Sequence, residues 1–162
     1  MGDMFSGSEI VEMAVQIEMN GKDFYFALTK KAKDPKAAKI FQFLADEEER
    51  HIATFRKIRG SVKDYEPKEA YPEEYYSYLR ALAGDHIFTR ENKGIQAAQG
   101  ITSDKEALET GMSFEKDSII FYEAMKKIVP ETDRGAIEAL IEQEGKHFTV
   151  LSELRNSLNQ GG

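Results

Sequence analysis

Residues 44–55 read LADEEERHIATF and decide the fold, because at helical spacing they set polar side chains within an apolar stripe. The apolar members of the stripe are Ile40, Leu44, Phe55 and Ile58, and the polar members are Glu48 and His51. A carboxylate and an imidazole in a buried seam cost free energy unless a partner neutralises them. We therefore expect a helix here whose buried face binds something charged.

The composition is that of a soluble globular protein, with 162 residues, 41% hydrophobic and 31% charged. This length suits a single domain, residues 1–162. The net charge of -7 disfavours a nucleic-acid partner, because phosphate backbones bind clustered Lys and Arg. No apolar run approaches the roughly 20 residues that span a bilayer, and the first residues lack the pattern of a signal peptide. We expect no membrane partner and a cytoplasmic location.

The sequence contains no cysteine. This excludes disulfides, thiolate metal sites, iron–sulfur clusters and cysteine nucleophiles. Any metal must therefore be held by carboxylates and imidazoles.

Helical periodicity dominates the chain, and it predicts long helices near 8–33, 36–59, 104–129 and 133–158. Expected start signals are the capping boxes Ser6-x-x-Glu9 and Ser103-x-x-Glu106, and the pair Asp34-Pro35. Expected stop signals are Gly60 and Pro130.

The chain contains an internal repeat. The first and third helices match at an offset of 97 positions, which aligns Glu18 with Glu115 and Tyr25 with Tyr122. The second and fourth helices match at an offset of 96, and the aligned pairs are Leu44 and Leu140, Glu48 and Glu144, His51 and His147, and Arg59 and Arg155. Each half thus supplies one Glu followed by a Glu-x-x-His.

The repeat predicts two helical hairpins, residues 8–60 and 104–158, joined by a long crossover, residues 61–103. Tyr76, Leu79 and Leu82 indicate a short helix within the crossover. The predicted fold is all-α: a ferritin-like antiparallel four-helix bundle.

Six polar side chains should converge in mid-bundle if a pseudo-twofold axis relates the hairpins: Glu18, Glu48, His51, Glu115, Glu144 and His147. Four carboxylates carry a charge of -4, which two divalent cations would neutralise. Each ion would take one terminal Glu and one His, with Glu48 and Glu144 bridging, as in di-iron and di-manganese bundles. His86 lacks an acid three residues upstream and is predicted to be a surface or packing residue.

The neighbouring residues have less specific interpretations. Asp46, Glu47, Glu49 and Arg50 are predicted to form a solvated face. Core or dimer-interface positions are predicted for Phe24, Phe26, Phe41, Phe43, Phe114 and Phe121, and crossover packing for Tyr71, Tyr75, Tyr76 and Tyr78. Tyr25 and Tyr122 are either core tyrosines or hydrogen-bond donors to the ligand carboxylates. Gly21 and Ser118 would leave room for an oxidant.

The stretches IEMNGKDFY, LADEEERHIATF, FEKDSIIFY and IEQEGKHFTVL resemble the rubrerythrin group of the ferritin-like superfamily. The resemblance implies that the same six residues hold two iron ions, with Mn or Zn as alternative metals. It implies reduction of hydrogen peroxide or dioxygen in a homodimer.

The sequence departs from this group in three ways. It has no cysteine for the rubredoxin domain that typical members append, so we expect a separate protein to donate the electrons. Met112 and Ser118, and no further carboxylate, flank Glu115 by one turn. Glu49 and Arg50 stand where bacterioferritins have a haem-binding Met.

Three other functions use similar residues. They are ferroxidation with iron storage, dimanganese catalase activity, and a non-enzymatic bundle that the metals merely hold together.

Overall fold

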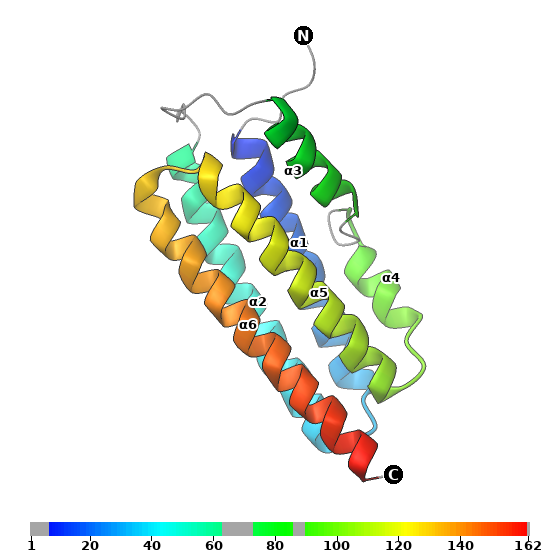
Figure 1. Cartoon of the computed structure of the whole chain (residues 1–162). Coiled ribbons are helices and arrows are strands. Elements are labelled where there is room, and N and C mark those ends of the chain that lie inside the picture. Colours follow the sequence, from blue (N-terminus) through cyan, green and yellow to red (C-terminus); the bar gives the residue numbers. More distant parts are fainter. Residues whose placement is uncertain (1–6, 63–72, 86–89, 162) are drawn as a thin grey trace.

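Four long helices lie side by side in the computed structural model, which describes residues 7–62, 73–85 and 90–161 (Figure 1). They are α1 (Gly7–Lys31), α2 (Pro35–Val62), α5 (Asp104–Met125) and α6 (Glu131–Gln160). Helix α1 packs on α2 and α5 packs on α6, while α1 also contacts α5 and α2 contacts α6. The chain runs down α1, up α2, up α5 and down α6, so each of these contacting pairs is antiparallel.

The expected helix ends are close to the observed ones. Asp34 caps α2, because its Oδ1 accepts hydrogen bonds from the backbone N–H of Lys36 at 2.7 Å and Ala37 at 3.2 Å. The expected stop near Gly60 lies just before Val62, the last described residue of α2. After α5 the chain makes a 3-10 turn at Lys126–Ile128 and reverses at Pro130.

Only half of the expected capping box at the start of α5 is present. Ser103 Oγ accepts the Glu106 N–H at 3.1 Å, but the Glu106 carboxylate accepts from the backbone N–H and hydroxyl of Thr102. The other expected box includes Ser6, which lies outside the described residues.

The crossover contains two described helices, α3 (Glu73–Asp85) and α4 (Lys93–Gln99), where the sequence predicted one. Tyr75 of α3 donates a hydrogen bond to the Ala124 carbonyl of α5, as expected for crossover packing, whereas Tyr78 is half-exposed. Tyr71 and His86 lie outside the described residues.

Helix α4 approaches the backbone of α1 closely. A Cβ at Gly94 would lie 2.0 Å from the Asn20 carbonyl oxygen, so only glycine permits this contact. The buried Asn20 side chain donates to the Arg90 carbonyl at 2.7 Å and accepts the Gly94 N–H at 3.2 Å. Helix α4 has only seven residues, too few for a clear helical period, which explains why the sequence did not predict it.

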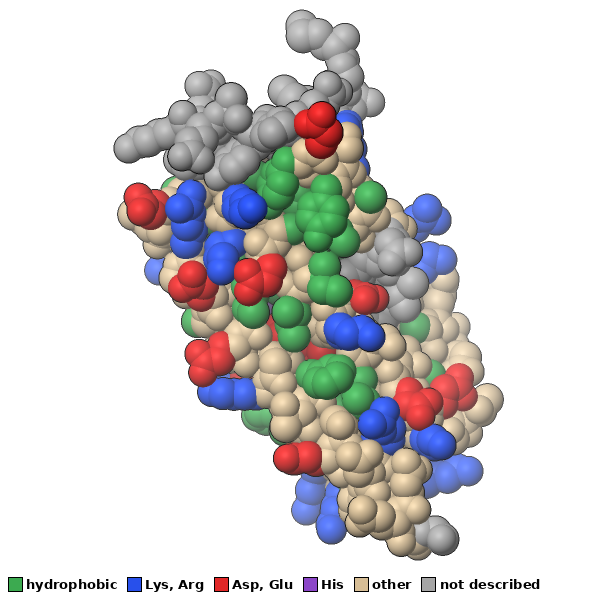
Figure 2. All heavy atoms as spheres, in the orientation of Figure 1, with side chains coloured by type: hydrophobic (Ala, Val, Ile, Leu, Met, Phe, Trp, Pro, Cys, Tyr) green, Lys and Arg blue, Asp and Glu red, His purple; other side chains and the backbone are tan. Residues whose placement is uncertain are grey.

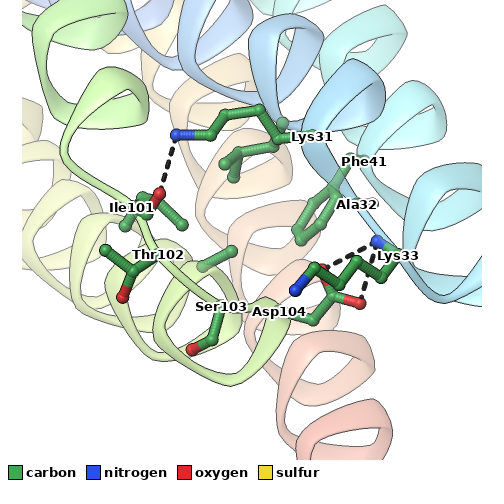
Figure 3. A pocket seen from close by; sticks show the side chains of 10 residues that line it. Lys31, Ala32, Lys33, Phe41, Ile101, Thr102, Ser103 and Asp104 are labelled. Carbon is green, nitrogen blue, oxygen red and sulfur yellow. Dashed lines mark hydrogen bonds between the residues drawn. The ribbon is translucent and has the colours of Figure 1, made fainter.

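Polar contacts also hold the end of the crossover against the first hairpin (Figure 3). Lys31 Nζ donates to the carbonyls of Ala98 at 2.8 Å and Ile101 at 2.7 Å. Asp104 Oδ2 accepts the Asp34 N–H at 2.8 Å. These bonds set the position along the bundle axis at which α5 begins, and hence the register of α5 against α1.

Apolar side chains fill the interior, including Phe24, Phe41, Phe114 and Phe121. Phe26 and Phe43 are 49% exposed, so they are not core residues. The face drawn in Figure 2 carries scattered side chains of both charges, with hydrophobic ones gathered beneath the upper end of α3. Among the described helices, none combines the length and hydropathy needed to cross a membrane.

Candidate metal centre

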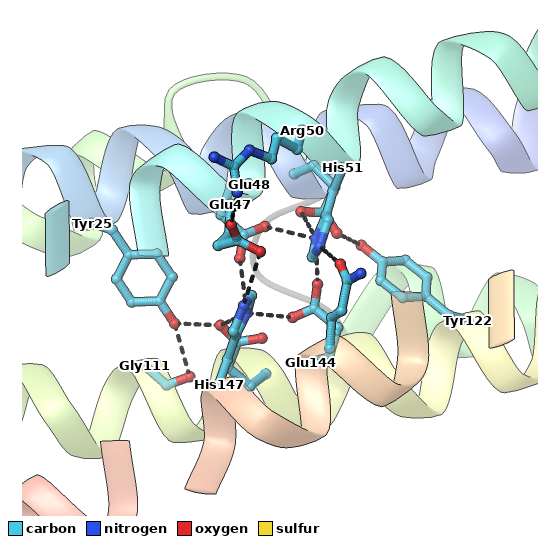
Figure 4. A network of polar contacts seen from close by, with 12 residues as sticks. Tyr25, Glu47, Glu48, Arg50, His51, Gly111, Tyr122, Glu144 and His147 are labelled. Carbon is cyan, nitrogen blue, oxygen red and sulfur yellow. Dashed lines mark hydrogen bonds and ion pairs between the residues drawn. The ribbon is translucent and has the colours of Figure 1, made fainter. Parts of the chain in front are cut away.

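The six predicted side chains meet in the middle of the bundle (Figure 4). Each long helix contributes: Glu18 from α1, Glu48 and His51 from α2, Glu115 from α5, and Glu144 and His147 from α6. All six are at most 3% exposed. The helical period places Glu and His on one face, and the antiparallel pairs direct these faces toward one another.

The six residues form two overlapping groups of possible metal ligands. One group is Glu18, Glu48, His51 and Glu144, and the other is Glu48, Glu115, Glu144 and His147. Within each group the ligand atoms lie within 4.8 Å of one another. Glu48 and Glu144 belong to both groups, so each can bridge two ions, whereas Glu18 and Glu115 can serve only one.

Most side-chain polar atoms of this cluster lack hydrogen-bond partners. In the described part of the chain, eight of the ten buried side-chain N and O atoms without a partner belong to these six residues. They include both carboxylate oxygens of Glu48 and of Glu144, and Nδ1 of both histidines. Buried polar atoms are normally satisfied, so this concentration is typical of a ligand-binding site. Carboxylate oxygens and imidazole nitrogens suit two divalent metal ions.

Both imidazoles direct Nδ1 toward the carboxylates. His51 Nδ1 lies 2.7 Å from Glu144 Oε1 and 3.4 Å from Glu18 Oε2. His147 Nδ1 lies 3.6 Å from both Glu115 and Glu144. The two imidazole rings stack at a centroid separation of 5.7 Å.

The pKa values of the cluster show how burial and neighbouring charges affect its ionisation when no metal is bound. Burial, together with the charge of Glu144, raises the pKa of Glu18 to about 7. Burial alone would lower the pKa of His51, but the charges of Glu18 and Glu144 outweigh it and raise the pKa to about 11. Burial also opposes ionisation of Glu144, yet the two imidazoles keep its pKa below the usual value. Protons thus partly neutralise the cluster, and metal ions would displace them.

The two repeat-related tyrosines cross between the hairpins. Tyr25 of α1 donates to Glu115 Oε1 of α5 at 2.8 Å, and Tyr122 of α5 donates to Glu18 Oε1 of α1. Burial raises the pKa of both phenols well above the usual value, so they remain donors at neutral pH. Each therefore orients one terminal carboxylate.

Two further residues near the centre were not predicted. Gln143 Oε1 lies 2.7 Å from His51 Nε2, and Glu47 Oε2 lies 4.0 Å from His147 Nε2. The prediction that Glu47 belongs to a solvated face is wrong, since its side chain is 14% exposed and turns toward His147. The sequence repeat could have indicated both residues, because Glu47 and Gln143 are themselves related by the offset of 96.

The space beside Gly21 holds no oxidant pocket. A Cβ at Gly21 would lie 2.5 Å from the Phe114 ring and 3.4 Å from Glu48 Oε2, so Phe114 fills that space and the expectation at Gly21 is wrong. At the repeat-related position, Ser118 is fully buried. Neither Ser118 nor Met112 supplies a further carboxylate one turn from Glu115.

Comparisons with known proteins agree with this geometry. A crystal structure from Thermotoga maritima, described as a ferritin-like diiron-carboxylate protein, superposes with a TM-score of 0.68 and 26% sequence identity. The match covers 96% of this chain and 98% of the other. No curated protein sequence matches significantly. The rubrerythrin family model matches residues 9–155, which include most of the four long helices and the whole Glu/His cluster, and the chain therefore belongs to the rubrerythrin family.

Proposed function

We propose that this protein is a non-haem di-iron oxidoreductase that reduces hydrogen peroxide or dioxygen with electrons from a separate donor protein. One observation carries the proposal. Six buried side chains from four helices leave eight polar atoms without hydrogen-bond partners, and these residues form two overlapping groups of possible metal ligands. Family membership favours iron among the metals that such ligands accept.

The six residues would share the two ions as their grouping suggests. Glu18 and His51 would hold one ion, Glu115 and His147 the other, and Glu48 and Glu144 both. When bound, a pair of ferrous ions supplies the two electrons that reductive cleavage of an O–O bond requires. Hydrogen peroxide, two electrons and two protons give two water molecules, and the donor protein restores the two electrons one at a time.

The surrounding residues hold this arrangement and keep solvent out. Tyr25 and Tyr122 keep their protons and fix the terminal carboxylates through hydrogen bonds. Phe114 closes the space next to Gly21 and Glu48. A dry site strengthens the attraction between the carboxylates and the dications.

The test uses full-length protein purified and loaded anaerobically with Fe(II). We expect two irons per chain, and consumption of two electrons from a reduced one-electron carrier protein for each peroxide. The chain would be a catalase if it released dioxygen from peroxide without a reductant. It would be a storage protein if it accumulated many irons per chain in a hollow assembly. Redox-silent metal that raised only the unfolding temperature would show a structural role.

We propose in addition that the protein acts as a cytoplasmic homodimer. The half-exposed rings of Phe26 and Phe43 support an interface on the outer face of the first hairpin. Sedimentation velocity should give twice the chain mass of 18.4 kDa, and a single-chain mass would reject the dimer.

A further inference from the structure

The two repeat-related residues beside the histidines are chemically different, and this difference distinguishes the two halves of the centre. Gln143 is a neutral amide and contacts His51, while Glu47 is a carboxylate and faces His147. Each residue precedes a shared glutamate and lies close to the imidazole of the opposite hairpin; Glu47 and His147 are labelled in Figure 4. All six proposed ligands are matched by the repeat, but these two positions are not.

Glu47 Oε2 lies 4.0 Å from His147 Nε2, beyond hydrogen-bond length, so Glu47 acts on the ring through its negative charge. That charge favours the tautomer with the proton on Nε2, which leaves Nδ1 as an electron-pair donor toward Glu115 and Glu144. The negative charge also makes the imidazole a stronger metal ligand. Arg50 pairs with Glu47 through Oε1 at the exposed side, which leaves Oε2 facing His147.

The amide beside His51 imposes no such choice. With Oε1 toward the ring, Gln143 accepts the Nε2 proton and leaves Nδ1 able to bind a metal. Rotated by half a turn, the amide donates to Nε2 instead and favours the tautomer that has its proton on Nδ1. The His51 ring is also more constrained, since its Nδ1 contacts Glu144 at 2.7 Å, whereas Glu115 and Glu144 each lie 3.6 Å from His147 Nδ1.

We propose that Glu47 and Gln143 make the two metal positions inequivalent, so that the first ion binds at His147 with Glu115 and the second at His51 with Glu18. Glu47 and Gln143 act as positioning residues through the imidazoles. The inference rests on the dinuclear site of the proposed function but not on its redox activity.

The test follows the imidazole nitrogens of full-length, metal-free, ¹⁵N-histidine-labelled protein by NMR during titration with Zn(II). In the natural sequence, the His147 signals should change during the first equivalent and the His51 signals during the second. Glu47→Gln should weaken the first binding step about 10–100-fold. The double variant E47Q/Q143E keeps the net charge and should reverse the order, so that His51 responds first.

Glu49→Gln is the matched control. It removes the same charge from the same helix, but Glu49 is 59% exposed and pairs with Lys22 on the far side, so the order should not change. Simultaneous responses in the natural sequence, or an unchanged order in E47Q/Q143E, would overturn the inference and leave the dinuclear site intact. Two equivalents of Zn(II) without any imidazole response would overturn both. A purely structural role for Glu47 would alter the melting temperature but not the binding order.

Discussion

The Tyr25 hydroxyl lies 2.8 Å from Glu115 Oε1, and the two residues come from different hairpins, 90 positions apart in the sequence. The reciprocal bond joins Tyr122 to Glu18. The tyrosines thus connect the two halves of the repeat at the same level as the Glu/His cluster. The hairpins are held together here by polar bonds as well as by apolar packing.

Replacing Tyr25 with Phe should reduce the free energy of unfolding by about 1–3 kcal/mol, because a buried carboxylate oxygen loses its donor. Metal affinity should fall about 10–100-fold, since the terminal carboxylate is no longer oriented. Tyr122→Phe should behave alike. Urea unfolding and metal titration measure the two effects. The control is Tyr78→Phe on half-exposed Tyr78, which should change stability by less than about 0.5 kcal/mol.

The shared and terminal carboxylates should differ in metal stoichiometry. Glu48→Gln removes a ligand that belongs to both groups, so we expect neither ion to survive desalting. Glu115→Gln removes a ligand of one group only, and about one ion per chain should remain. Metal analysis after desalting measures this. Glu142→Gln, at an exposed position of α6, should retain two ions. Equal losses from Glu48→Gln and Glu115→Gln would contradict the bridging assignment.

The stability of the metal-free protein should fall as pH rises. The pKa of Glu18 is raised from 4.5 to about 7 and that of His51 from 6.5 to about 11, so the native state binds more protons than the unfolded chain. Glu18 contributes its full amount to the free energy of unfolding below pH 4.5, and this contribution is lost by about pH 7. The contribution of His51 to the free energy of unfolding is lost between about pH 6.5 and 11. The lowered pKa of Glu144 has the opposite effect, but only below about pH 4.5.

Metal should reverse this trend, because its ligands must be deprotonated to bind. The melting temperatures of metal-free and metal-loaded protein should therefore diverge between pH 5.5 and pH 8.5. Glu18→Gln should remove the part of the metal-free slope between pH 4.5 and 7. A metal-free protein whose stability increases with pH over this range would show that the carboxylates do not share protons as described.

Gly21→Ala should destabilise the protein by about 1–3 kcal/mol, because its methyl group overlaps the buried Phe114 ring. The displaced ring would crowd Glu48, so metal affinity should fall as well. Gly135→Ala is the control: it is also in a helix, has no atom within 4 Å of its added Cβ, and should stabilise by up to about 1 kcal/mol. Thermal unfolding of both variants measures the difference, and equal effects would contradict the packing at Gly21.

Much of the fold and of the cluster could be predicted because both depend on local spacing. A Glu and a His three residues apart share a helical face whatever surrounds them, and the repeat shows that the chain does this twice. The four long helices and their pairing in hairpins followed from the same periodicity. Short elements without a clear period, such as α4, did not.

The remaining features depend on distances between helices, which periodicity does not specify. Sequence spacing placed Glu47 on a solvated face, but the approach of α6 turned it toward His147. The room expected beside Gly21 was filled by Phe114 from another helix. The sequence by itself determined which residues could form a dinuclear centre, because helical geometry is local. Only the tertiary structure decided which tyrosine holds which carboxylate and which neighbour supports each imidazole, since those contacts join residues about 90 to 104 positions apart.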